Sequence, residues 1–154
     1  MKRIVCLFLI LPFLGCAGSA SRPDGMPPLV ECNVKILSEG QPLPDVTVEF
    51  HSADPSFQWG ASGVTDASGN ARMVTYSQFF GAVEGEYAVT VSKLEREEFD
   101  PEKPPRQVRV FTLTEAQYTN PQETPLRITV SGRTTETFDV GKTGREVLRM
   151  EDAQ

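Results

Sequence analysis

The sequence predicts an all-β protein: one β-sandwich of about seven strands, preceded by a signal peptide and a flexible tether. Apolar and polar residues alternate with a period of two in several short segments, as they do in strands with one buried face. Clusters of turn-forming residues separate these segments, and almost no stretch has a helical period. The 154 residues allow one domain, and a domain of roughly 110 residues buries a useful core without disulfides.

The first sixteen residues are typical of a lipoprotein signal. Lys2 and Arg3 form a basic start, and the apolar run that follows is shorter than the about 20 helical residues that span a bilayer. The run ends at Leu14-Gly15-Cys16, which resembles the bacterial lipobox, where the cysteine receives diacylglycerol before cleavage. We therefore predict that residues 1–15 are a signal peptide and that Cys16 is lipidated. Ordinary secretory cleavage with an unmodified Cys16 is the alternative.

Cleavage before Cys16 leaves 139 residues, and the loss of two basic residues changes the formal net charge from −6 to −8. An acidic protein has no general basic surface for nucleic acid, and it does not attract anionic lipid head groups. We therefore expect no nucleic-acid partner, and attachment to the membrane through the acyl chains. Ala17 follows the cysteine, which resembles lipoproteins sorted to the outer membrane, on its periplasmic or its outward face.

Residues 16–28 are expected to be the lipidated cysteine and a flexible tether, because residues 17–28 are small, polar and rich in proline. This stretch spans at most about 40 Å when extended. The sandwich is expected over residues 29–140. Residues 141–154 show no reliable period and are expected to form a frayed polar tail.

Seven segments are expected as strands because apolar side chains recur at every second position. They run over residues 30–36, 46–51, 58–65, 71–76, 87–91, 126–131 and 135–140. The turns between them contain Gly, Pro, Asp and Asn, and the turn at 66–70 is expected to join its flanking strands into a hairpin.

The stretch between the fifth and sixth strands has a different character. Residues 95–105 are charged and rich in proline, which predicts an exposed loop. Residues 108–113 are expected to form a strand or an extended segment. One helical turn is expected in 114–125, with Thr114 as its N-cap.

Three sequence blocks carry a resemblance to a known family. Gly40–Val48 is similar to the G-x-P-L-x-x-V-x-V block of the carboxypeptidase regulatory-like, or transthyretin-like, domain. Thr65–Ala71 resembles its T-D-x-x-G-x-A/F hairpin, and Gly85–Val91 resembles its G-x-Y-x-V-x-V strand. The resemblance implies an Ig/transthyretin-like sandwich. In small bacterial lipoproteins it implies a non-catalytic module for adhesion, assembly or support.

Cysteine and histidine are too few for several kinds of site. Cys6 leaves with the signal and Cys16 is used by the lipid, so Cys32 has no partner for a disulfide. Cys32 lies on the apolar face of a predicted strand, which favours a buried small residue over a reactive thiol. The one histidine, His51, is expected at a solvated strand end, on the sheet face opposite to Phe50.

The single histidine also excludes two enzyme families that share this general fold. Intradiol ring-cleaving dioxygenases hold iron with two Tyr and two His, and hydroxyisourate hydrolases use several His. A triad of His51, Ser52 and Asp54 is disfavoured, because residues adjacent in sequence rarely form one. We therefore expect no catalytic residues, no metal and no cofactor.

Aromatic residues around the turn at 66–70 form the candidate binding site. If exposed together, they offer a stacking platform for sugar rings or an apolar patch for a protein partner, and otherwise they belong to the core. The residues are Phe57, Trp59, Tyr76, Phe79 and Phe80.

The predicted function is a non-catalytic, lipid-anchored module of the cell envelope, for binding or structural support, with an envelope protein or a polysaccharide as partner. One alternative is a glycan-binding module, which requires Phe57, Trp59 and Phe80 to be exposed in one plane. The other is an enzyme, which requires titratable side chains that converge in a concave pocket.

Overall fold

The computed structural model describes residues 21–99 and 107–152. The strands of its main body are β1 (Leu29–Val30), β2 (Cys32–Ser38), β3 (Gln41–Pro42), β4 (Thr47–Ser52), β5 (Ala61–Val64), β6 (Asn70–Arg72), β7 (Val74–Thr75), β8 (Phe79–Phe80), β9 (Ala82–Val83), β10 (Gly85–Ser92), β13 (Arg127–Val130) and β14 (Thr134–Asp139). The remaining elements are β11 (Leu94–Phe99), β12 (Gln107–Thr112), β15 (Glu146–Asp152) and one short helix, α1 (Ala116–Thr119).

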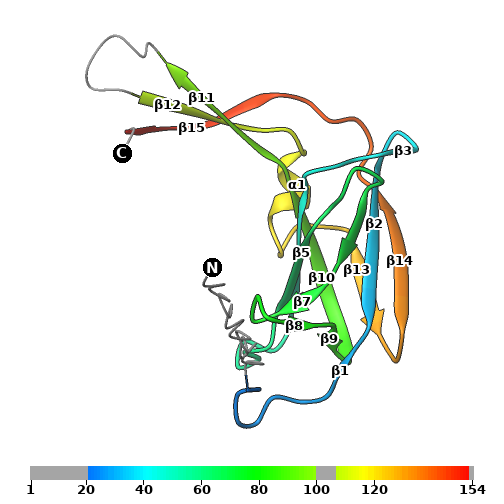
Figure 1. Ribbon diagram of the computed structural model, residues 1–154. Coiled ribbons are helices and arrows are strands. Elements are labelled where there is room, and N and C mark those ends of the chain that lie inside the picture. The colour runs from blue at the N-terminus through cyan, green and yellow to red at the C-terminus, as the bar shows by residue number, and fades with distance from the viewer. Residues whose placement is uncertain (1–20, 100–106, 153–154) are drawn as a thin grey trace, which may run out of the picture.

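Two sheets face each other in a sandwich-like body (Figure 1). The larger sheet has the order β13-β10-β4-β5-β7-β8, and the smaller one has the order β14-β2-β3, with β6 also paired to β2. The mostly β, sandwich-like fold is confirmed. The expected strands at 46–51, 87–91, 126–131 and 135–140 correspond to β4, β10, β13 and β14.

The core lies between the sheets, where the apolar positions of the alternating segments meet. Cys32, Val34 and Ile36 of β2 are buried to 1% exposure or less, and so are Val48 of β4 and Val89 of β10. β4 and β10 pair antiparallel, so their inward residues lie opposite one another, as Val48 does to Val91. Alternation therefore placed the core face of these strands correctly.

The expected hairpin around the turn at 66–70 forms only in part, because the returning chain pairs with β5 through β7 alone. Asp66 does shape the turn as expected, because its Oδ1 accepts the backbone N–H groups of Ser68 and Asn70. However, β6 then pairs with β2 in the smaller sheet, and β7 pairs with β5 in the larger one. The chain changes sheets at the fully buried Met73, as strands do at the corners of sandwiches.

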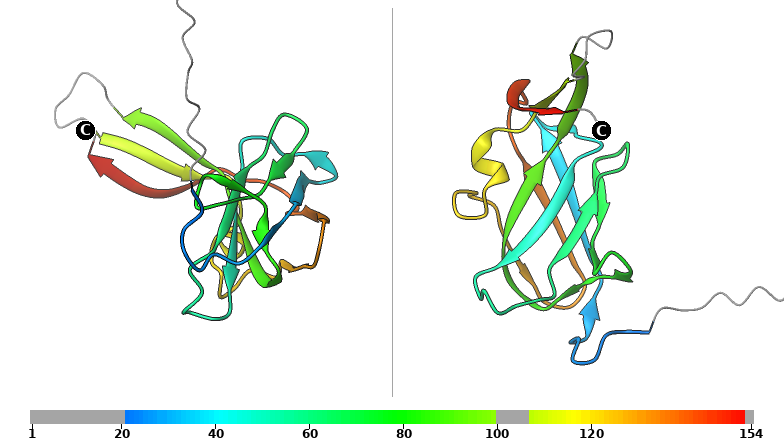
Figure 2. Two further views of the ribbon diagram at one scale, coloured as in Figure 1. Left: turned by 60° about the horizontal axis from the view of Figure 1, so that its bottom comes forward. Right: turned by 90° about the vertical axis from the view of Figure 1, so that its left-hand side faces the viewer.

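Three strands form an arm that projects from one end of the sandwich (Figures 1 and 2). β12 lies in the middle and pairs antiparallel with β11 and with β15. The expected extended segment at 108–113 is therefore a strand. The exposed loop expected from residue 95 is wrong for 95–99, and the frayed tail is wrong for 146–152. Alternation missed β11 and β15 because their described side chains are exposed, whereas β12 between them carries the buried Val110 and Phe111.

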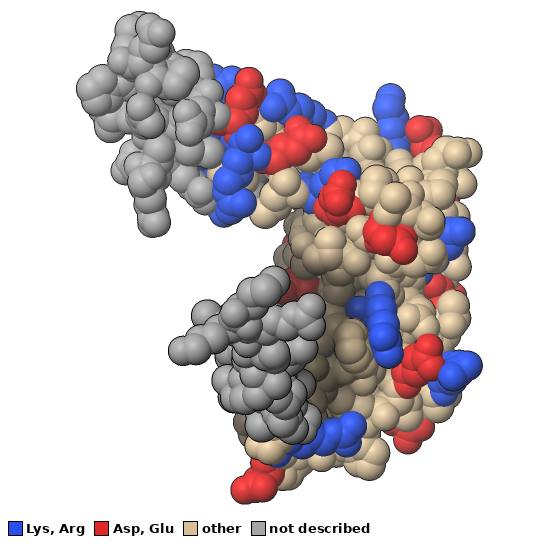
Figure 3. Space-filling view, in the orientation of Figure 1, with Lys and Arg blue, Asp and Glu red and all other residues tan. Residues whose placement is uncertain are grey.

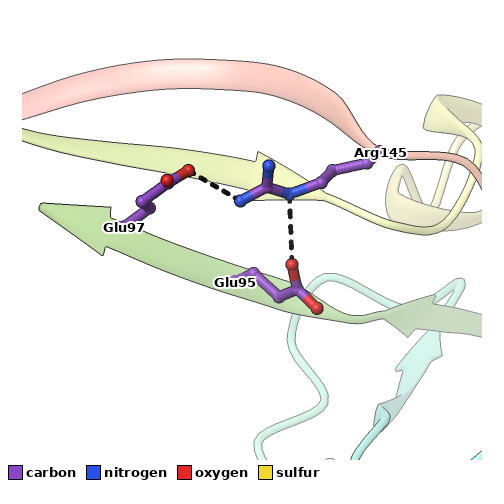
Figure 4. Close-up of polar contacts among 3 residues, drawn as sticks. All are labelled: Glu95, Glu97 and Arg145. Carbon is purple, nitrogen blue, oxygen red and sulfur yellow. Dashed lines mark hydrogen bonds and ion pairs between the residues drawn. The ribbon is translucent and has the colours of Figure 1, made fainter. Parts of the chain in front are cut away.

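One arginine, Arg145, forms ion pairs with two glutamates of the arm (Figure 4). Arg145 donates from Nε to Glu95, at 3.2 Å, and from Nη2 to Glu97, at 2.8 Å. Its guanidinium carbon also lies 3.6 Å from the ring centroid of Phe111 on β12. The helical turn α1 follows β12, and its N-cap is Glu115 with no side-chain capping bond, so the expected Thr114 cap is wrong.

The end of the sandwich opposite the arm receives the N-terminal segment (Figure 1). β1 pairs antiparallel with β9, Leu29 opposite Val83 and Val30 opposite Ala82. Gly81 lies between β8 and β9 with φ +110°, and an added Cβ would approach the Val30 carbonyl oxygen to 2.5 Å. Only glycine allows this close approach, so Gly81 holds β1 against the sandwich.

We predict that Gly81→Ala destabilises the protein by about 3 kcal/mol, because it combines a disfavoured φ with a backbone clash. Gly132→Ala is the matched control, since Gly132 has φ +62° with open space around its Cα, and we expect about 1 kcal/mol there. Urea unfolding followed by circular dichroism measures both. Equal losses in the two variants would contradict the role of Gly81.

Candidate functional site: an aromatic rim and a polar hollow

The five aromatic residues singled out from the sequence divide into two groups. Phe57 packs against the core, where its ring centroid lies 5.8 Å from that of Tyr87 in an edge-on arrangement. Phe79 is half-buried on β8, opposite Thr75. The side chains of Tyr76 and Phe80 are 52% and 61% exposed, and Trp59 is half-buried beside Tyr76. The sequence pattern did not distinguish the residue that packs against the core from those at the surface.

Trp59 and Tyr76 form an aromatic pair at the surface. Their ring centroids are 5.5 Å apart, with an angle of 41° between the planes. Tyr76 lies in the turn between β7 and β8, where Tyr76 and Ser77 both adopt positive φ, 56° and 54°. This conformation costs about 1 kcal/mol or more for each non-glycine residue, so the turn holds Tyr76 outward at a cost in stability.

Phe80 makes a second contact of an aromatic ring at this surface, which the sequence did not predict. The guanidinium carbon of Arg72 lies 3.8 Å from the Phe80 ring centroid, in cation–π geometry. Nothing in the local sequence connects these residues, because Arg72 is on β6 in the smaller sheet and Phe80 is on β8 in the larger. We call Trp59, Tyr76, Phe80 and Arg72 the aromatic rim.

A polar hollow of about 590 Å³ lies on the outer face of the larger sheet. Its walls include His51 of β4, Glu86 of β10 and Arg127 of β13, with Pro121 and Gln122 of the loop after α1 on one side. Alternation places the three charged or titratable residues on one face. The alternation of side chains along these strands could therefore have revealed the shared face. The position of the loop with Pro121 and Gln122, at the side of the hollow, depends on the tertiary structure.

Three polar side chains of the hollow are hydrogen-bonded to nearby protein atoms. His51 is half-buried rather than fully solvated, and its Nε2 lies 2.8 Å from Thr90 Oγ1. Arg127 donates to the carbonyl oxygens of Thr124 and Leu126. Ser52 Oγ accepts the N–H of Asp54 at 3.1 Å. The hollow has the mixed charge to bind a small polar molecule, but these bonds do not pair a nucleophile with a base.

Cys32 is a core residue, as expected. It is fully buried, and desolvation raises the pKa of its thiol to about 11. Tyr87 packs in the same core, and its hydroxyl donates to the Val83 carbonyl oxygen at 2.8 Å. Within residues 21–99 and 107–152, no group of three His, Cys, Asp or Glu side chains is placed to hold a metal ion.

The proposed lipidation site, Cys16, and the signal peptide lie outside the described residues. In the described part of the chain, no helix is long and apolar enough to cross a membrane.

We predict that the Cys32 thiol reacts with Ellman's reagent at pH 8 at least about 100-fold more slowly in the folded protein than in urea. The measurement uses a Cys6→Ser, Cys16→Ser variant, in which Cys32 is the one thiol. The pKa is raised on folding, so stability is lost as pH rises from about 9 towards 11, by about 2 kcal/mol. Equal reaction rates in both states would contradict burial of the thiol.

No protein-family model and no curated protein matches this sequence. Among solved structures, the chain is similar to a 9R-lipoxygenase from Cyanothece PCC8801, at 18% sequence identity and a TM-score of 0.33. The similar region covers 80% of this chain and 18% of the lipoxygenase chain.

Proposed function

We propose that the protein is a non-catalytic, lipid-anchored module of the cell envelope, that Ala17 directs it to the outer membrane, and that its arm binds a partner protein. The observation that carries this proposal is the position of the arm. It projects from the end of the sandwich opposite to β1, through which the tethered N-terminal segment enters (Figures 1 and 2). A lipid at Cys16 therefore leaves the arm free to reach away from the membrane.

The arm has the features of a protein-binding surface. β11 and β15 are the edge strands of its sheet, and edge strands offer backbone N–H and C=O groups to an extended partner segment. Val147 of β15 is 58% exposed, and charges of both signs lie along the arm in the view of Figure 3. Such a mixed surface suits a partner that matches both shape and charge.

We further propose an Ig/transthyretin-like topology of the carboxypeptidase regulatory-like kind. The sandwich-like body supports this, and so do the positions of the three similar blocks. Gly40–Val48 runs from a turn into β4, Thr65–Ala71 spans the turn before β6, and Gly85–Val91 lies in β10. The non-catalytic assignment is supported by the bonds that already engage His51, Ser52 and Arg127.

The glycan-binding alternative receives less support. It required Phe57, Trp59 and Phe80 in one exposed plane, and Phe57 packs against the core instead. At the surface, the half-buried Trp59 pairs with the exposed Tyr76, but their rings are inclined by 41° and offer no flat surface of the kind that stacks on a sugar ring.

We predict that Cys16→Ala abolishes incorporation of labelled palmitate and releases the protein from membranes, because the acyl chains provide the attachment. Cys6→Ala is the matched control, since Cys6 lies in the predicted signal peptide and leaves with it. Sedimentation of membranes and fluorography measure the two effects. Palmitate labelling that persists in Cys16→Ala would refute the anchor.

We predict that a photo-crosslinking residue at Val147 forms a discrete protein adduct in intact cell envelopes, while one at Val64 does not. The two valines are similarly exposed, at 58% and 62%, but Val147 is on the arm and Val64 is on the sandwich. Immunoblotting detects the adducts. Adducts at both positions, or at neither, would contradict the arm as the binding surface.

A further inference from the structure

We infer that the aromatic rim docks onto the lipid bilayer and holds the sandwich against the membrane that carries its anchor. This inference rests on the proposed lipid anchor at Cys16. It adds a second membrane contact, made by side chains of the folded domain. The argument depends on where the rim lies, how far the tether reaches and what the rim is made of.

The rim lies at the end of the sandwich that receives the N-terminal segment. Tyr76 and Phe80 belong to the β7–β8 hairpin, and β9 follows β8 after the single residue Gly81. β9 pairs with β1, so the chain coming from the anchor enters one short strand away from Phe80. The loop between β4 and β5, which contains Trp59, lies at the same end in Figures 1 and 2.

The tether keeps this end close to the bilayer. Leu29 follows Cys16 by 13 residues in the sequence. A chain of that length spans at most about 45 Å even when fully extended. Docking is therefore an intramolecular event, in which a few weakly binding side chains are sufficient because their effective concentration at the membrane is high.

The composition of the rim matches the membrane interface. Trp and Tyr have an apolar ring with a polar group and favour the level of the lipid head groups, while Phe80 offers a fully apolar ring. Arg72 lies over the Phe80 ring, so its charge can remain among the head groups while its stem covers apolar surface. Tyr76 and Phe80 are two of the five large apolar or aromatic side chains that are exposed in the described residues.

The formal net charge, −6 for the whole sequence and −8 after the predicted cleavage, gives the rim no long-range attraction to anionic lipid. Docking therefore rests on ring insertion, and it occurs on zwitterionic phosphatidylcholine and persists at high salt. This distinguishes the inference from adsorption of a basic protein, which requires anionic lipid and is reversed by salt.

Trp59 is the one tryptophan of the chain, so its fluorescence reports on the rim directly. The lipidated protein is purified from membranes and reconstituted into phosphatidylcholine vesicles, with plain acyl chains or with chains brominated near the head group. We expect the brominated lipid to lower Trp59 emission about twofold, because the indole lies at the interface. The ratio of emission in the two lipids is compared within each variant, so that loss of the Tyr76 contact does not affect the result.

The test variant is Tyr76→Ser, Phe80→Ser, for which we expect the quenching to be lost. The control is Val64→Ser, Val147→Ser, which removes two similarly exposed apolar side chains elsewhere and should leave the quenching unchanged. Circular dichroism verifies that both variants fold. Quenching that survives in the test variant, or that disappears equally in the control, would overturn the inference.

Sedimentation of the vesicles separates the two proposals. Protein that sediments without quenching retains its anchor and refutes docking, whereas protein that stays in the supernatant refutes both. Soluble chitohexaose is added to the reconstituted protein to test the alternative that the rim binds a glycan. A shift of Trp59 emission with chitohexaose but no quenching by brominated lipid would assign the rim to a glycan and overturn docking.

Discussion

The packing of β2 against β4 and β10 is the constraint on which the rest of the structure depends. Val34 and Ile36 on one side and Val48 and Val89 on the other are almost completely removed from solvent. Each such side chain contributes about 1.5–3 kcal/mol, and no disulfide supplements them among the described residues. Because side chains alternate along a strand, burying these positions also determines which residues face outward. His51, Glu86 and Arg127 meet at the polar hollow for that reason.

One stretch of chain organises the end that carries the rim. Between Asn70 and Val83 it leaves the smaller sheet at Met73, forms the β7–β8 hairpin and then supplies β9 as the partner of β1. The glycine at position 81 allows the backbone of Val30 to approach this stretch closely. The arriving N-terminal segment and the exposed aromatic side chains are therefore neighbours because a single short segment builds both.

The arm is held by different forces from those in the sandwich. Its sequence is charged, and the ion pairs of Arg145 with Glu95 and Glu97 are about half exposed, so water screens them and each stabilises the arm only weakly. Backbone pairing of β12 with both neighbours, and the contact of Arg145 with Phe111, complete the arm.

The sequence by itself determined the all-β class, the buried faces of β2, β4, β10 and β13, the turn at Asp66 and the core position of Cys32. These features follow from alternation and turn chemistry, which are local properties of the chain. Only the tertiary structure decided that the chain changes sheets at Met73, that β11, β12 and β15 form an arm, and that Phe57 packs against the core while Phe80 is exposed. The tertiary structure alone also decided the contact of Arg72 with Phe80 and the set of residues that line the hollow. The physical reason is that all these features depend on which distant strands become neighbours. The alternation of apolar and polar residues does not reveal this, because it is the same whichever sheet a strand joins.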